Sequence, residues 1–135
     1  MMVLAGIAGG LVGTLWAGLV SAPLFVRWPA LRPERWQPET AARLLAGAVL
    51  HGLCGAGAGL LFWLSWGLVA VVSTPWPLVG VLYGTLLFTA GGLPLLGALA
   101  FRARGPRGAV AVLAAEGFVA AVSAGVMCAY VWERQ

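Results

Sequence analysis

Two ionisable side chains stand inside otherwise apolar stretches of the sequence, and they are its clearest candidates for chemistry. His51, the one histidine of the chain, lies in the run GAVLHGLCGAGAGLLFW (residues 47–63). Glu116 lies in the run AVLAAEGFVAA (residues 111–121). An imidazole and a carboxyl can share or transfer a proton, and both are costly to bury without a partner. What they can do therefore depends on the elements that carry them.

The composition places those elements in a lipid bilayer. The chain has 135 residues, of which 61% are hydrophobic and 9% are charged, and its mean hydropathy is +0.97. A water-soluble domain carries about 25% charged residues, so this chain has too few to cover a soluble surface. Stretches of roughly 20 apolar residues indicate membrane-spanning helices. Four such stretches predict an all-α bundle of four transmembrane helices in a single domain over residues 1–135, with spans at about 3–26, 44–67, 78–101 and 108–132.

The positions of the arginines predict how the bundle is oriented. Lysine is absent, and most of the arginines lie in the first and third connections, residues 27–43 and 102–107. Because arginine-rich connections stay in the cytoplasm, we expect both of them there, with the N- and C-termini periplasmic. Arginine without lysine, together with the absence of Asp and Asn, is typical of GC-rich bacterial genomes and favours a bacterial inner membrane. Since topology accounts for the arginines, no nucleic-acid partner is expected.

Counting along the predicted helices places His51 and Glu116 at one depth. Each lies four residues before the centre of its span, near residues 55 and 120. At about 1.5 Å per residue, that is about 6 Å to the cytoplasmic side of the midplane. A hydrogen bond between the two side chains would relieve the cost of burying each. We therefore predict an intramembrane polar pair, His51 and Glu116, which either locks the bundle or binds and couples protons.

Glycines spaced four residues apart predict where the helices approach each other closely. Without side chains in the way, two helix backbones come into van der Waals contact, which favours association in a bilayer. Four helices cannot use every such face internally, so some faces are expected to pack against another chain. The predicted packing residues are Gly9, Gly13, Gly55, Gly59, Gly80, Gly84 and Gly117.

The first and third spans share a pattern that indicates an internal repeat. Residues 9–25 read GGLVGTLWAGLVSAPLF and residues 80–96 read GVLYGTLLFTAGGLPLL. The bundle is therefore expected to consist of two similar helical hairpins that run in the same direction. The matched threonines and prolines are secondary site candidates, because a proline also frees a backbone carbonyl one turn earlier. Cys54 is a further candidate, because it lies three residues after His51 on the same helix. The secondary candidates are thus Thr14, Thr85, Pro23, Pro94 and Cys54.

No resident metal, cofactor or disulfide is expected. His51 and Cys54 supply two metal ligands, or three with Glu116, which is fewer than a structural zinc site uses. A single histidine also gives no pair of axial ligands for a haem. Cys54 and Cys128 are predicted at different depths, too far apart for a disulfide.

The sequence contains no nucleophile beside a base and no phosphate-binding loop, so an enzyme is not expected. Two hypotheses about function remain. The first is a membrane protein that acts through helix packing, as an accessory subunit of a membrane complex or as a homo-oligomer. The second is a small proton-linked transporter or channel that uses Glu116 and His51. The expected partners are the lipid bilayer and either other membrane subunits or further copies of the chain.

Overall fold

The computed structural model describes residues 1–31, 40–69, 74–102 and 107–135, and within these ranges the regular structure is helical throughout. Four helical segments are long and apolar enough to cross a membrane, which confirms the predicted four-helix membrane bundle. Their ends lie within three residues of the predicted ones. The segments are Met2–Arg27, Leu45–Ser65, Trp76–Ala98 and Gly108–Glu133.

The helices follow the chain in a simple up-and-down order. The first, second and fourth spans belong to single helices, whereas the third span consists of two helices joined by a π-helical segment, Phe88–Gly92. A short 3-10 turn, Pro29–Leu31, follows the first helix. The five helices are α1 (Met2–Arg27), α2 (Ala41–Val69), α3 (Trp76–Leu87), α4 (Leu93–Arg102) and α5 (Arg107–Glu133).

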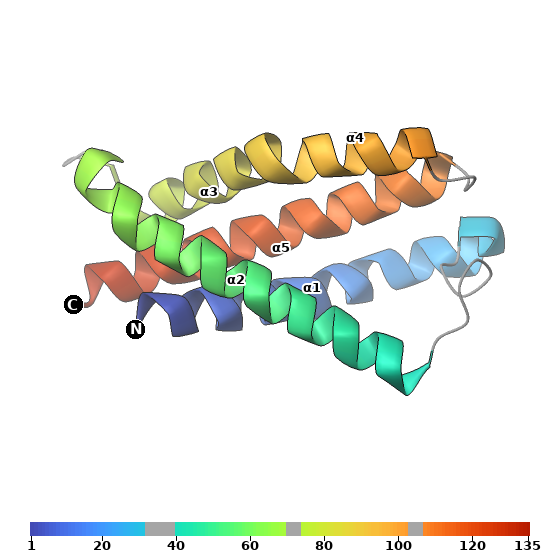
Figure 1. Ribbon diagram of the computed structural model, residues 1–135, viewed down its shortest axis with the longest axis horizontal. Helices are drawn as coiled ribbons and strands as arrows, with labels where there is room; N and C mark the ends of the chain where they lie inside the picture. Colours follow the sequence, from blue (N-terminus) through green and yellow to red (C-terminus); the bar gives the residue numbers. More distant parts are fainter. Residues whose placement is uncertain (32–39, 70–73, 103–106) are drawn as a thin grey trace.

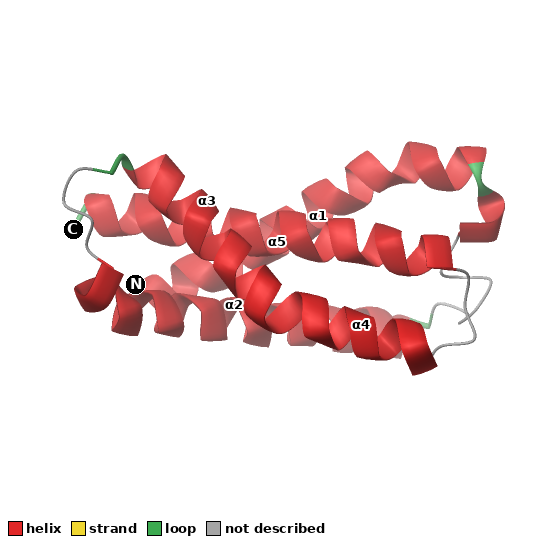
Figure 2. Ribbon diagram, turned by 90° about the horizontal axis from the view of Figure 1, so that it is seen from above, coloured by secondary structure: helices red, strands yellow, loops and turns green. Residues whose placement is uncertain are grey.

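Helix α5 runs through the middle of the bundle, as Figures 1 and 2 show. It packs against α1 on one side and α3 on the other, and α1 also packs against α2. Both chain termini lie at one end, and α2 crosses α1 obliquely and diverges from α4 toward the other end (Figure 1).

The two ends of the bundle carry different residues. The end opposite the termini holds the helix ends that contain Arg27, Arg43, Arg102 and Arg107. The remaining arginines of the two connections, Arg32, Arg35 and Arg104, lie outside the described residues. We call the half nearer the termini the terminal half and the other half the arginine half. The terminal half comprises residues 1–14, 55–69, 74–86 and 121–135, and the arginine half comprises residues 15–31, 40–54, 87–102 and 107–120.

Close backbone contact holds the terminal half together. A Cβ atom added to Gly55 would lie 2.9 Å from the carbonyl carbon of Gly6, and one added to Gly84 would lie 2.8 Å from the backbone nitrogen of Val122. Real Cβ atoms do not approach other atoms so closely, so larger residues would force the helices apart. The buried side chains of this half are correspondingly small, apart from Met2 and Phe62.

Helix α1 uses two neighbouring glycine faces, one for each of its partners. Gly6 and Gly10 meet α2 at Gly55, whereas Gly9 and Gly13 meet α5 near Ala124 and Ser123. The repeat-matched glycines of α3, Gly80 and Gly84, also pack against α5. Of the predicted packing residues, Gly117 differs, because its nearest neighbour is the Phe88 side chain at 3.4 Å. The hairpin repeat itself stays a prediction.

The arginine half is packed more loosely. Of the buried residues that the structure describes, only Ala17 and Ser21 belong to it. The third span changes its hydrogen bonding here, since the Leu93 N–H donates to the Phe88 carbonyl five residues back. Pro94 follows directly and has no N–H for a regular helical bond, which explains a π-helical segment at this point. The matched Pro23 lies inside a continuous α1, so the two prolines are accommodated differently.

Candidate functional site

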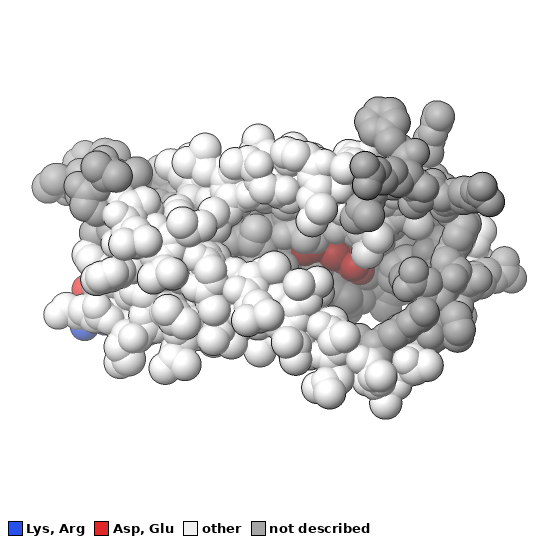
Figure 3. All heavy atoms as spheres, in the orientation of Figure 1, with Lys and Arg blue, Asp and Glu red and all other residues white. Residues whose placement is uncertain are grey.

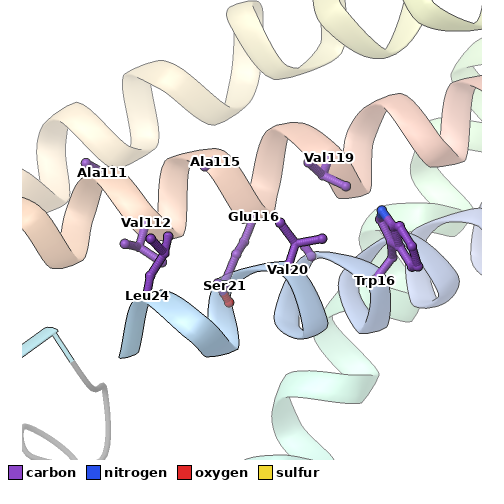
Figure 4. A pocket seen from close by; sticks show the side chains of 10 residues that line it. Trp16, Val20, Ser21, Leu24, Ala111, Val112, Ala115, Glu116 and Val119 are labelled. Carbon is purple, nitrogen blue, oxygen red and sulfur yellow. The ribbon is translucent and has the colours of Figure 1, made fainter. Parts of the chain in front are cut away.

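The hydrogen-bond partner of Glu116 is a serine on the neighbouring helix. The Ser21 hydroxyl donates to Glu116 Oε1 over 2.6 Å and thereby joins α1 to α5. Figure 4 shows the two side chains directed toward each other. Ser21 is 5% exposed, and Glu116 is half-buried in the seam between the helices. An intramembrane carboxyl is thus held in place by one neutral hydroxyl.

A second contact of Ser21 bears on the protonation of Glu116. The same hydroxyl oxygen lies 3.1 Å from the Gly18 carbonyl. A hydroxyl carries one hydrogen, so it donates fully to the carboxyl or to the carbonyl, but not to both. The two contacts can be complete hydrogen bonds together if the carboxyl is protonated, because it then donates to Ser21, which donates to Gly18. The geometry therefore accommodates both protonation states of Glu116.

Glu116 lines a pocket between α1 and α5 in the arginine half. The pocket has a volume of about 350 Å³, and the described residues that line it are apolar apart from Ser21, Glu116 and the indole N–H of Trp16. Trp16 lies toward one end of it (Figure 4). Figure 3 shows acidic atoms at the bottom of a hollow in the bundle surface, right of centre, so a carboxyl is partly accessible from outside. The lining residues are Trp16, Ala17, Val20, Ser21, Leu24, Ala111, Val112, Ala115, Glu116 and Val119.

His51 does not join Glu116, so the predicted hydrogen bond between them is wrong for this structure. The His51 side chain is exposed on α2, and its Nδ1 lies 2.7 Å from the Gly47 carbonyl one turn earlier. A carbonyl can only accept, so Nδ1 is the donor. The prediction considered the depth of the two side chains along the membrane normal and not the lateral positions of their helices. The two glycine faces of α1 set α2 and α5 on different sides of that helix, and equal depth does not bring their side chains together.

The secondary candidates lie apart from this site. Thr14 and Thr85 each donate to the carbonyl four residues earlier, over 2.8 Å, as threonines in helices commonly do. Cys54 is an exposed free thiol, and Cys128 is a buried free thiol in the terminal half. Neither Pro23 nor Pro94 lines the pocket. None of the secondary candidates therefore contributes to the Glu116 pocket.

Ser21 and Trp16 line the pocket beside Glu116, and neither was predicted from the sequence as a site residue. Ser21 could have been found from its spacing, because it continues the stripe of small residues Gly9, Gly13 and Ala17 along the face of α1 that meets α5. A polar residue at the end of such a stripe faces the neighbouring helix rather than lipid. No sequence signal marked Trp16, because a tryptophan in a membrane span can face lipid as well as a pocket.

The described residues contain no group of three or more His, Cys, Asp or Glu side chains close enough to hold a metal ion. The chain matches no protein-family model, no curated protein and no solved structure. The site geometry is therefore the basis for the functional argument.

Proposed function

We propose that this membrane protein is a small proton-linked transporter or channel, working as an oligomer, in which Glu116 carries the proton. The observation behind the proposal is the line of three groups formed by Glu116, Ser21 and the Gly18 carbonyl. Ionisable residues inside membrane spans commonly mark proton or ion pathways. This one lies beside an open pocket and not in a sealed core.

The three groups give the carboxyl a hydrogen-bond partner in either protonation state. When Glu116 is protonated, it donates to Ser21, and Ser21 donates to Gly18. When Glu116 is ionised, Ser21 turns its hydrogen to the carboxylate, and the Gly18 carbonyl keeps only its helical bond. A rotation about the Cβ–Oγ bond of Ser21, which reorients its hydroxyl hydrogen, connects the two arrangements. Proton binding and release therefore require no rearrangement of the helices, which suits a residue that cycles between both states.

The test is a proton-flux measurement in liposomes with two matched variants. Glu116→Gln removes the ionisable group from the pocket, and Glu133→Gln removes an exposed carboxyl at the C-terminal end of α5. Under an imposed pH gradient, with a pH-sensitive dye inside, the wild type and Glu133→Gln are expected to carry protons, and Glu116→Gln is not. Equal flux through Glu116→Gln and the wild type, or no flux above empty liposomes, would refute the proposal.

A second function is favoured by the position of His51. We propose as the alternative an accessory subunit of a membrane complex, or a homo-oligomer, that acts through helix packing. Nδ1 of His51 donates to its own helix, and Nε2 has no hydrogen-bond partner among the described residues. An imidazole nitrogen facing lipid is unfavourable. A neighbouring chain that donates a hydrogen bond to Nε2 would remove this cost.

The surroundings of His51 support the same alternative. Among the α2 residues 41–42 and 45–54, whose burial the structure describes, none is buried, and a Cβ on Gly47 or Gly52 would meet nothing within 4 Å. The side of α2 that carries Gly47 and Gly52 is therefore open, and a small-residue surface lets another helix approach closely.

Native mass spectrometry after gentle extraction tests this alternative. The wild type is expected to leave the membrane with other subunits or further copies, and His51→Leu is expected to lose them. Leu50→Ala alters the neighbouring exposed residue and is the control that should keep the assembly. A monomeric wild type would exclude the alternative, and an intact assembly of His51→Leu would exclude His51 as its contact.

We propose the bacterial inner membrane as the location, with both termini periplasmic. The support is the grouping of the helix ends that carry Arg27, Arg43, Arg102 and Arg107 at the end opposite the termini. Such grouping is typical of a cytoplasmic face. Reporter fusions test the orientation, since alkaline phosphatase at the C-terminus should be active and a fluorescent protein should be dark there.

A further inference from the structure

The pocket beside Glu116 has features that a proton does not need. It has a volume of about 350 Å³, near the lower end of the range of about 300–1,000 Å³ common for small-molecule sites. We propose that it binds a lipophilic monovalent cation, with Glu116 as the counter-ion and Trp16 as an aromatic wall. This inference names the substrate class of the proposed transporter. Its transport part rests on that function, whereas binding can be tested without transport.

The charge of the site selects the sign of the ligand. Among the described residues that line the pocket, Glu116 is the one with an ionisable side chain. A carboxylate surrounded by apolar side chains has little solvation, so a cation beside it regains much of the lost stabilisation. An anion would be repelled at the same place. The site therefore favours a single positive charge, which matches the one negative charge it offers.

The lining also argues for an organic cation over a metal ion. Hard metal cations require several oxygen ligands, six or more for calcium. Besides Glu116, the pocket offers the Ser21 hydroxyl, and the other lining side chains are Ala, Val, Leu and Trp. These side chains suit the hydrocarbon groups of a substituted ammonium or phosphonium ion. A cation that carries its own apolar shell needs no further oxygen ligands.

Trp16 adds a second group that attracts a cation. It precedes Ser21 by five residues on α1, which separates the two by about 7.5 Å along the helix axis. An organic cation between them can contact the carboxylate at one side and the indole at the other. Tryptophan is the best aromatic partner for cations, within about 6 Å of the ring centroid. Trp16 is 61% exposed, so part of the indole is open to such a ligand.

Binding of the cation and of the proton exclude each other at one carboxyl. The cation enters as the Glu116 O–H bond breaks, one proton leaves to solvent, and the Ser21 hydrogen turns from Gly18 to the carboxylate. Charge is conserved, because one positive charge replaces another. Of the helices packed against α1 and α5, α2 carries His51 and Cys54 as further titratable groups in the arginine half, and neither lines the pocket. Acidification is therefore expected to weaken cation binding through Glu116.

The test is equilibrium dialysis of the purified protein in micelles, with protein-free micelles as the blank. The probes are tetraphenylphosphonium and tetraphenylborate, which share size and shape and differ in the sign of their charge. The protein is expected to bind the cation and not the anion. Glu116→Gln is expected to weaken cation binding at least about tenfold, and Glu133→Gln is expected to leave it unchanged.

A second pair of variants tests the aromatic wall and keeps the inference testable if Glu116→Gln fails to fold. Trp16→Leu is expected to weaken cation binding about twofold to thirtyfold. Trp63→Leu alters an exposed tryptophan that does not line the pocket, and it is expected to have no effect.

The outcomes separate binding from transport. Equal binding of both probes, no saturable binding, or equal weakening by the two tryptophan variants would overturn the inference. Selective cation binding that is lost in Glu116→Gln supports it even if liposomes show no proton flux, in which case the proposed transport fails and the binding site stands.

Discussion

The two halves of this bundle differ in how closely their helices pack. In the terminal half, glycines and alanines on facing helices bring the backbones into contact, as at Gly55 against α1 and Gly84 against α5. In the arginine half, buried positions are reduced to Ala17 and Ser21 among the described residues. There the helices diverge, and the bundle contains a pocket, an intramembrane carboxyl and an exposed histidine.

The difference shows what holds a small membrane bundle together. Lipid tails solvate apolar side chains as well as other helices do, so burying leucine or valine gives little net stabilisation. Close contact between small residues does stabilise the bundle, because it increases the number of van der Waals contacts between the helices. Where small residues no longer face each other across two helices, this close contact is lost, and space and polar groups become available. We therefore assign stability to the terminal half and place the proposed function in the arginine half.

The largest effect is expected from enlarging a contact glycine in the terminal half. In Gly55→Ala the new methyl group would overlap the backbone of α1 around Gly6 and Ile7, so α1 and α2 must separate. The free energy of unfolding, measured by SDS titration in micelles, should fall by about 1–3 kcal/mol. The control is Gly57→Ala on the same helix, where a Cβ meets nothing within 4 Å. Equal destabilisation by both variants would contradict the packing argument.

An intermediate effect is expected from removing one inter-helix hydrogen bond in each half. Ser21→Ala removes the bond to Glu116, and Tyr83→Phe removes the 2.6 Å bond from the Tyr83 hydroxyl to the Ala58 carbonyl. Each should lower the free energy of unfolding by about 0.6 kcal/mol. The halves should then differ in the proposed function, because Ser21→Ala is expected to alter proton flux and cation binding and Tyr83→Phe is expected to alter neither. Impaired flux in Tyr83→Phe alone would reverse the assignment.

The smallest effect is expected from the two matched prolines. Pro94→Ala supplies an N–H that can bond to the Ala90 carbonyl, which allows the π-helical segment to revert to regular helix. Amide exchange over residues 88–93 should slow severalfold. Pro23→Ala changes a helix that is already continuous, so slower exchange should stay within the turn preceding it. A similar response over both stretches would mean that the π-helical segment has another cause.

Much of the fold could be predicted because it depends on one coordinate, the position along the membrane normal. Apolar length fixes the spans, arginine placement groups the helix ends, and a constant rise per residue gives the depth of each side chain. The π-helical segment was not predicted. Pro94 indicated only a disturbed helix, and the form of the disturbance depends on how the freed carbonyl finds a donor.

The candidate site was predicted in part, because it depends on lateral neighbours as well as depth. Glu116 was found as an isolated carboxyl in an apolar run, and its partner was wrongly given as His51. Which helices touch is decided by crossing geometry, here by two glycine faces on α1 that lead to α2 and α5. No count along a single helix contains that information. The Ser21 partnership follows once α1 and α5 are known to be neighbours.

The small-residue core also inverts the usual relation between the size of a side chain and its tolerance to mutation. Leu4, Leu15 and Leu19 are 66%, 70% and 69% exposed. In a bilayer they meet lipid tails, where one aliphatic side chain can replace another at little cost. A contact glycine has no smaller substitute. In a complete mutational scan, the intolerant positions would therefore be those with the least side chain, and heritable variation would accumulate at the bulkiest residues.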